Sequence, residues 1–141
     1  MAGYDTFVKV PKERIGVLVG PGGHVKEEVQ RRLSVELDID SETGDITISL
    51  NKDAHDPSLL FKAKDVVTAI GRGFSPERAF KLFEDESSML EVIDLREIFG
   101  SSESDIRRVK GRIIGKDGKT RRIIEEMSEA AVSIYGHTVS M

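Results

Sequence analysis

Apolar and polar positions in the first third of the chain follow two different spacings. They alternate over 6–10, which predicts a strand, and Pro11 can then occupy the first position of a helix that extends to about Val19. Three of the four residues in 20–23 are glycines, so this segment is expected to be a turn. A second helix is then predicted from apolar residues at four-residue spacing: Val25, Val29 and Leu33.

A hairpin and a long helix complete this pattern. Strict alternation over 35–40 and 46–50 predicts two strands, which the turn cluster 41–45 joins. Pro57 can begin a helix that extends to about Ile70. The predicted inward positions of this helix are Leu59, Leu60, Ala63, Val66, Val67 and Ile70. The predicted order of elements is therefore β-α-α-β-β-α.

A further helix is predicted to end the first domain. Ser75 followed by Pro76 is typical of a helix start, because serine caps the first turn and proline fits its first position. The apolar residues expected in this helix are Phe80, Leu82 and Phe83. The acidic segment 84–88 is the expected linker, which gives a first domain at 1–83 and a second at 89–141.

The second domain is predicted to repeat the same order without the last helix. Its predicted elements are a strand over 89–95, a helix capped by Ser102 or Ser104 that ends near Ile114, a helix after Gly118, a strand over 131–135, a turn at Gly136 and His137, and the start of a strand at Thr138. With no closing helix, the sheet is expected to expose Val132, Ile134 and, as a further candidate, Val139. We therefore expect that the chain is a fragment, or that a C-terminal segment, a neighbouring chain or the helix with Phe80 covers this face.

The two domains share a repeat at a constant offset of 95 residues. It aligns Gly20 with Gly115 and Gly23 with Gly118. The apolar positions that it aligns are Leu18 with Ile113, Val19 with Ile114, Val29 with Ile124, Leu37 with Val132, and Ile39 with Ile134. A repeat this long indicates two similar folding units.

Each unit carries a Gly-x-x-Gly turn between two helices, at 20–23 and at 115–118. Glycines let another backbone approach closely, and the unpaired N–H groups and positive dipole end of the following helix favour a phosphate. In these features the sequence resembles the KH family. The resemblance implies an α+β fold with two tandem type I KH domains (β-α-α-β-β-α), the second lacking its C-terminal helix. It also implies that each loop clamps about four nucleotides of single-stranded RNA.

The resemblance implies a set of RNA-binding residues in and beside the two turns. They are Gly20, Pro21, Gly22, Gly23, His24, Lys26, Arg112, Gly115, Lys116, Asp117, Gly118, Lys119, Arg121 and Arg122. The residue three positions after the last glycine of the loop is usually aliphatic in this family, but here it is Lys26 in one unit and Arg121 in the other. This departure affects the expected shape of the groove beside the loop, not the expected role of the loop. For His24, a hydrogen bond to RNA and plain exposure both remain open. No catalytic residue, metal ligand or cofactor is expected.

The tandem arrangement, the acidic connector and the loops Gly-Pro-Gly-Gly and Gly-Lys-Asp-Gly resemble a narrower family. This family comprises the archaeal relatives of Partner of Nob One, a small-subunit ribosome assembly factor. The resemblance implies binding to small-subunit rRNA near its 3′ end. It also implies partnership with the endonuclease that matures this rRNA, and with other ribosome assembly or translation factors. A cytoplasmic location without membrane contact is expected, since no signal peptide or apolar span is evident.

The distribution of charge along the chain leads to a different conclusion about nucleic-acid binding than the net charge does. The chain carries a net charge of −4, which argues against nucleic acid. However, segment 107–122 holds eight Lys and Arg against one acid, Asp117, and segment 9–32 holds six against three. The remaining residues therefore carry −14, so local basic surfaces are predicted on an acidic body. A solvated helix face is the plainer explanation of such charge runs.

Enzyme classes fit the sequence poorly. Gly118, Lys119 and Thr120 look like the end of a Walker A loop, but that motif needs a glycine where Ile113 stands, and a preceding strand. The first turn lacks the third glycine of a dinucleotide-binding fingerprint, because Val25 occupies that position.

A metal site and a base-stacking aromatic residue are also weakly indicated. The three histidines, His24, His55 and His137, lack the spacing of metal ligands. Tyr135 lies on a half-buried strand, where packing is favoured over base stacking. The main alternative to RNA binding is a protein-interaction adaptor with the KH fold, in which only the second domain, or neither, binds RNA.

Overall fold

The chain forms two compact units, Met1–Met89 and Leu90–Met141. The computed structural model describes residues 5–54, 56–84, 88–100 and 102–141. Residues 85–87 of the expected linker, His55 and the side chain of Phe83 lie outside the described residues. No helix in the described ranges is long and apolar enough to cross a membrane.

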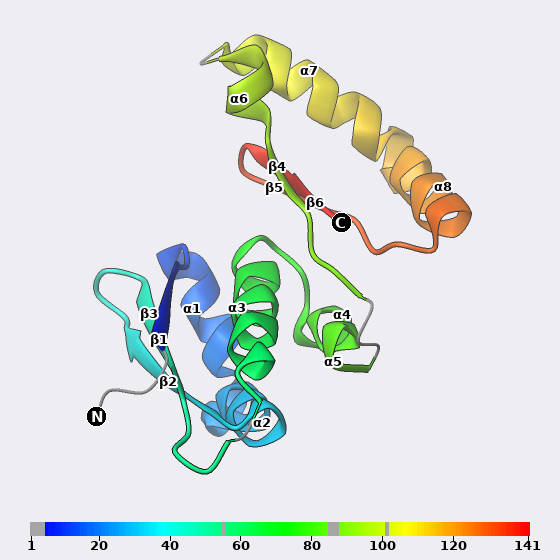
Figure 1. Ribbon diagram of the computed structural model, residues 1–141. Helices are drawn as coiled ribbons and strands as arrows, with labels where there is room; N and C mark the ends of the chain where they lie inside the picture. The colour runs from blue at the N-terminus through cyan, green and yellow to red at the C-terminus, as the bar shows by residue number, and fades with distance from the viewer. Residues whose placement is uncertain (1–4, 55, 85–87, 101) are drawn as a thin grey trace. The chain divides into compact units, whose positions relative to one another are not determined.

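The first unit has the predicted β-α-α-β-β-α order, followed by two short helices. Its elements are β1 (Asp5–Lys9), α1 (Lys12–Val19), α2 (His24–Leu33), β2 (Val35–Asp40), β3 (Asp45–Leu50), α3 (Ser58–Gly71), α4 (Pro76–Ala79) and α5 (Lys81–Glu84). The three strands form an antiparallel sheet in the order β1-β3-β2 (Figure 1), so β2 lies at an edge.

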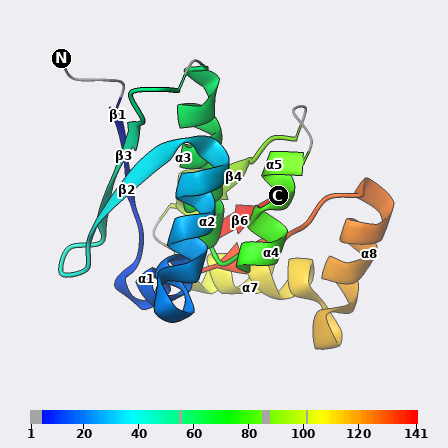
Figure 2. The ribbon, with the colours of Figure 1, turned by 90° about the horizontal axis from the view of Figure 1, so that it is seen from below.

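The helices α1, α2 and α3 lie on one face of this sheet, as Figures 1 and 2 show. Successive side chains of a strand point to opposite faces, so alternation places the apolar ones toward the helices. The buried strand residues are Val35, Leu37, Ile46 and Ile48. Of the predicted inward positions of α3, Leu59 is half-buried, and the buried ones are Leu60, Ala63, Val66, Val67 and Ile70.

The helix predicted after Pro76 is two helices. Phe80 separates α4 from α5, and the Arg32 guanidinium lies 6.0 Å from the centre of its ring. The start of α4 is as predicted, because the Ser75 hydroxyl accepts a hydrogen bond from the backbone N–H of Arg78. Leu82 is buried, so α5 adds to the core of the first unit.

The Arg14 side chain joins α1 to the end of α3. Arg14 Nε donates to the carbonyl of Ile70 at 2.9 Å, and Arg14 Nη2 donates to the carbonyl of Phe74 at 2.8 Å. Carbonyls at the end of a helix lack donors within the helix. The planar guanidinium, with its fixed fork of donors, therefore binds one carbonyl in the last turn of α3 and one in the segment just after it.

The second unit repeats the sheet, and no helix follows it within the described residues. Its elements are β4 (Val92–Asp94), α6 (Leu95–Phe99), α7 (Glu103–Ile114), α8 (Lys119–Ser128), β5 (Ser133–Tyr135) and β6 (Thr138–Ser140). The strand order β4-β6-β5 is antiparallel and matches that of the first unit. Met141, which follows β6, is not helical, and the mixed helix and strand content agrees with the predicted α+β class.

The strand predicted over 89–95 is too long. The strand β4 ends at Asp94, and Leu95 begins the unpredicted helix α6. Asp94 caps this helix, since its Oδ1 accepts a hydrogen bond from the backbone N–H of Arg96 at 2.9 Å. The spacing of Asp94 and Glu97 is that of a capping box, a signal in the sequence that predicts this helix start.

The prediction that the second sheet exposes an apolar patch is wrong for Val132 and Val139. Their side chains are 2% and 6% exposed and form a core with Leu95 and Ile106. Partly buried residues pack against this core: Phe99, Val109, Ile113, Ile124, Ile134 and Met141. The apolar stripes of α7 and α8, together with α6, therefore cover this part of the sheet without a closing helix.

We expect Arg14→Met to lower the free energy of unfolding by about 1.5–3 kcal/mol, because hydrogen bonds from a charged donor would be lost. The matched control is Arg31→Met, since Arg31 pairs with Glu28 on the surface, and a loss of about 0.5 kcal/mol or less is expected there. Urea denaturation of the full chain measures both. A loss for Arg14→Met no larger than that for Arg31→Met would contradict the role of Arg14.

Candidate nucleic-acid interface

The two Gly-x-x-Gly turns have the same backbone geometry. In the first loop (20–23), Gly20 N donates to Gly16 O at 2.9 Å and Gly23 N donates to Gly20 O at 3.1 Å. In the second loop (115–118), the equivalent bonds are Gly115 N to Gly111 O at 2.9 Å and Gly118 N to Gly115 O at 3.2 Å. Each loop contains a single 3₁₀ turn, Pro21–Gly23 or Lys116–Gly118. Both predicted turns are therefore present, and residues 95 positions apart form equivalent hydrogen bonds in the two loops.

The first glycine of each loop is required by close packing. Gly20 and Gly115 have φ of 75° and 73°, in the left-handed region that favours glycine. A Cβ on Gly20 would collide with the side chain of Val25, and one on Gly115 would collide with Thr120. Each loop thus lies directly on the first turn of the helix that follows it, where that helix presents N–H groups without intrahelical acceptors.

The second loop combines these N–H groups with exposed cations. Lys116 lies in the loop, Lys119 and Arg122 lie in the first turn of α8, and Arg112 lies in the last turn of α7, all four exposed. Asp117 also lies in the loop, with φ of 55°, a conformation that aspartate tolerates better than most residues. The positive end of the α8 dipole and four cations therefore surround one turn of backbone.

Arg121 and Lys26 occupy the positions where the sequence departs from the KH pattern. Both side chains are half-buried. The Nε of Arg121 is buried and has no hydrogen-bond partner among the described residues. Lys26 lines a groove of about 510 Å³ between α2 and β2. A long cation thus stands beside each loop where the family usually has an aliphatic side chain.

The first loop is much less cationic than the second. Pro21 and Gly22 are exposed, Gly23 is half-buried, and His24 is exposed at the start of α2. The groove beside this loop contains two acidic side chains, Glu36 and Asp38. The first loop therefore offers backbone geometry for a phosphate but little attractive charge.

In both units a helix side chain accepts a hydrogen bond from the backbone of the edge strand or of the residue just before it, and the sequence reasoning missed this contact. Gln30 Oε1 accepts from the backbone N–H of Leu37 at 2.9 Å. Glu125 Oε2 accepts from the backbone N–H of Val132 at 2.8 Å. Both pairs are related by the offset of 95 residues. Edge strands present unpaired backbone groups. The helix that follows the loop satisfies one such donor within β2 of the first unit and one directly before β5 of the second.

Metal-ligating side chains do not gather in the part of the chain that the structure describes. It contains no group of three or more His, Asp or Glu side chains that could hold a metal ion. Of the three histidines, His24 lies beside the first loop, His137 lies in the turn between β5 and β6, and His55 is outside the described residues. Tyr135 on β5 is half-buried.

Comparison with known proteins matches both units to KH domains. Residues 89–141 match a family described as eukaryotic type KH-domain (KH-domain type I), for the second such domain of PNO1. Residues 10–85 match the family described as the Krr1 KH1 domain.

Similar proteins occur in archaea and in a eukaryote. The chain is 50% identical over 135 residues to KH domain-containing protein MJ0443 from Methanocaldococcus jannaschii, which covers 96% of this chain and 58% of that protein. It is 25% identical over 125 residues to RNA-binding protein pno1 from Dictyostelium discoideum, covering 89% of this chain and 52% of that protein. The chain thus spans little more than half the length of these two relatives.

A solved structure has the same fold over nearly the whole chain. It is a chain in the crystal structure of the a/eIF2alpha-aDim2p-rRNA complex from Pyrococcus horikoshii OT3. The match has a TM-score of 0.89 and 50% sequence identity, and it covers 97% of this chain and 74% of that chain.

We expect Gly115→Ala to destabilise the second unit by about 1–3 kcal/mol, because alanine disfavours the positive φ and its Cβ would displace Thr120. Gly111→Ala is the matched control on α7, the helix that Gly115 ends, since a Cβ there meets nothing within 4 Å. This control should stabilise by about 0.5–1 kcal/mol. Thermal unfolding of both variants measures the difference, and equal melting temperatures would refute the packing requirement at Gly115.

Proposed function

The chain belongs to the archaeal PNO1-like family of KH-domain proteins, and on this premise we propose that it binds single-stranded RNA through its two Gly-x-x-Gly loops. The observation that carries the proposal is the second loop, where Lys116, Lys119 and Arg122 surround a helix N-terminus. Phosphate contacts of this kind supply most of the affinity for nucleic acid. RNA is held by the chain and not chemically changed by it.

The target that we propose is small-subunit rRNA, near its 3′ end, during ribosome assembly. Two relatives support this target: one carries the name RNA-binding protein pno1, and another was crystallised with a/eIF2alpha and rRNA. The endonuclease that matures this rRNA is the proposed protein partner, together with other assembly or translation factors.

The two units are proposed to contribute unequally. The second unit carries the strongly basic segment 107–122, whereas the groove of the first contains Glu36 and Asp38. Phosphate contacts through the second loop should therefore dominate affinity and make it fall steeply with salt. The acidic first groove also keeps open the alternative of an adaptor, in which the first unit, or both units, bind protein instead of RNA.

Lys116→Asp tests the proposed function. It would place two adjacent carboxylates, with Asp117, in the phosphate cradle, and we expect about a ten- to hundredfold loss of RNA affinity, the size of one or two charged contacts. The melting temperature should stay near wild type, since Lys116 is exposed. Fluorescence anisotropy with a single-stranded small-subunit rRNA 3′ fragment measures the affinity.

The matched control is Pro21→Asp with Gly22→Asp in the first loop. Asp117, which is equivalent to Gly22, shows that aspartate fits this backbone position. The first-loop variant should lose less affinity than Lys116→Asp. Wild-type affinity for Lys116→Asp would sink the assignment of the second loop.

Substituting Gln30 and Glu125, the helix side chains that accept these backbone hydrogen bonds, tests whether each groove contacts RNA. Glu125→Gln keeps an oxygen acceptor for Val132 N but removes a carboxylate from the basic unit, so RNA affinity should rise several-fold. Gln30→Glu adds a carboxylate to the first groove with the same geometry. Weaker binding by Gln30→Glu indicates that the first unit touches RNA, and unchanged binding supports the adaptor role of that unit.

A further inference from the structure

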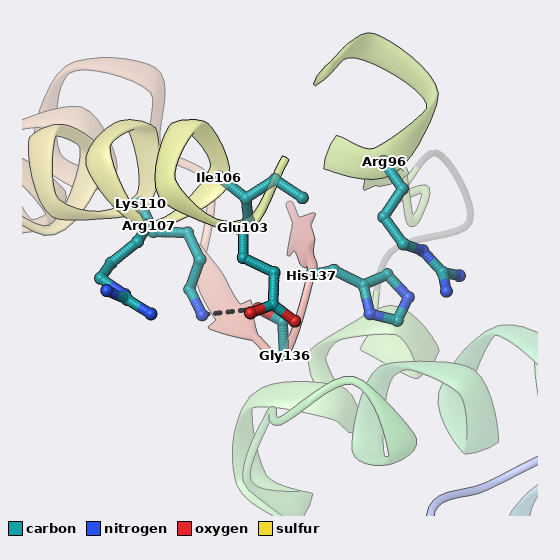
Figure 3. Close-up of a pocket in the computed structure, with 7 residues that line it drawn as sticks. All are labelled: Arg96, Glu103, Ile106, Arg107, Lys110, Gly136 and His137. Carbon is teal, nitrogen blue, oxygen red and sulfur yellow. Dashed lines mark hydrogen bonds between the residues drawn. The ribbon is translucent and has the colours of Figure 1, made fainter. Parts of the chain in front are cut away.

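A hollow of about 430 Å³ lies on the second unit, away from the glycines of its loop (Figure 3). One wall is formed by α7, and the turn between β5 and β6 forms part of the opposite wall. The side chains that matter are Glu103, Arg107 and Lys110 on α7, Arg96 on α6, and His137 in the turn. None of them was among the predicted RNA-binding residues.

Two of the cations at this hollow have no acidic partner. Among the described residues, Arg107 and Lys110 form no ion pair, and Lys110 Nζ donates to the carbonyl of Gly136 at 2.6 Å, the contact dashed in Figure 3. Arg96 differs, because its Nη2 lies 3.0 Å from Asp94 Oδ2. This contact with Arg96 lowers the pKa of Asp94 to about 2, so the pair stays charged at neutral pH. Arg107 and Lys110 are therefore the cations here without a carboxylate partner, and Lys110 Nζ has two donors besides the one bound to Gly136 O.

The hollow and the second loop are joined by one face of α7. Glu103, Arg107, Lys110 and Ile114 follow each other at spacings of four, three and four residues, which places them on the same face. Ile114 directly precedes Gly115. With a rise of 1.5 Å per residue, Lys110 lies about 7.5 Å and Arg107 about 12 Å along the helix axis from Gly115. A strand that leaves the loop along this face would meet both cations.

We propose that this hollow is a second phosphate site, in which Arg107 and Lys110 bind the RNA backbone adjacent to the nucleotides that the second loop holds. The inference rests on the proposed function and extends it to a longer strand than the loop alone can clamp. The Ile106 side chain and the His137 ring complete the lining, and Glu103 marks the far end, where a carboxylate repels the next phosphate.

The first unit lacks this second site. The offset of 95 residues places Lys12 at the position of Arg107, Ile15 at that of Lys110 and Glu42 at that of His137. Ile15 is buried in the core, so the first unit has one cation here and an acid in the turn. The extended strand path is therefore a property of the second unit alone.

Binding experiments with two RNAs of different length can distinguish this site from the loop. A tetranucleotide matches the roughly four nucleotides that a loop clamps, and an oligonucleotide of about ten nucleotides can also reach the hollow. We expect Arg107→Glu to weaken binding of the longer RNA about tenfold and to leave the tetranucleotide unchanged. At 0.15 M salt the Debye length is about 8 Å, so Arg107 has little effect on phosphates in the loop. Arg107→Ala should also reduce the slope of log affinity against log salt by about 0.7 for the longer RNA.

Variants on either side of Arg107 serve as matched tests. Lys12→Glu makes the same charge change at the equivalent exposed position of the first unit and should leave both RNAs bound as in wild type. Glu103→Gln should strengthen binding of the longer RNA. All variants should retain the wild-type melting temperature, because these side chains are exposed.

The second site would be overturned by equal losses for Arg107→Glu and Lys12→Glu, or by a loss that is the same for both RNA lengths. Unchanged binding of the longer RNA by Arg107→Glu, with a large loss for Lys116→Asp, would also remove the second site while preserving the proposed function. Failure of the wild-type chain to bind either RNA would instead remove the proposed function, and the second site with it.

Discussion

Each unit depends on the first glycine of a four-residue turn between two helices. Gly20 and Gly115 hold a left-handed conformation, and the next helix packs so closely that neither has room for a Cβ. This contact fixes where the second helix begins. Because a helix leaves its first N–H groups without intrahelical acceptors, the same contact also creates a phosphate-sized cradle. The cradle thus follows from packing and needs no charged side chain of its own.

Charge is what separates two units that share this backbone. At three exposed positions the second unit has a cation where the first has none. Lys116 corresponds to Pro21, Lys119 to His24, and Arg122 to the acidic Glu27. None of these side chains belongs to either core. Substitutions at exposed positions of this kind change stability little. One fold can therefore carry a strongly basic loop in the second unit and a weakly charged one in the first.

The fold could be predicted from the sequence where spacing alone decides it. Alternation in 35–40 and 46–50 and the three glycines of 20–23 were sufficient for the hairpin and the turn, and the repeat extended both to the second unit. Helix α6 was missed because five residues give too little periodicity, although its cap at Asp94 has a recognisable pattern. The burial of Val139 was missed because it depends on how helices meet the sheet. The hydrogen bond from Val132 N to Glu125 joins the start of the last hairpin to α8, and no local pattern predicts such a pairing.

The acidic average of the chain does not oppose the proposed RNA contacts, because electrostatic effects at the surface are local. Charges farther apart than about 8 Å are largely screened at physiological salt. The cations around the second loop lie within one or two helical turns of each other on α7 and α8, so they act together on a phosphate bound at the loop. In the first groove the same local effect disfavours a phosphate, because the carboxylates of Glu36 and Asp38 line it. The sign of the charge at each loop and in its groove, and not the net charge of −4, therefore governs what that loop can bind.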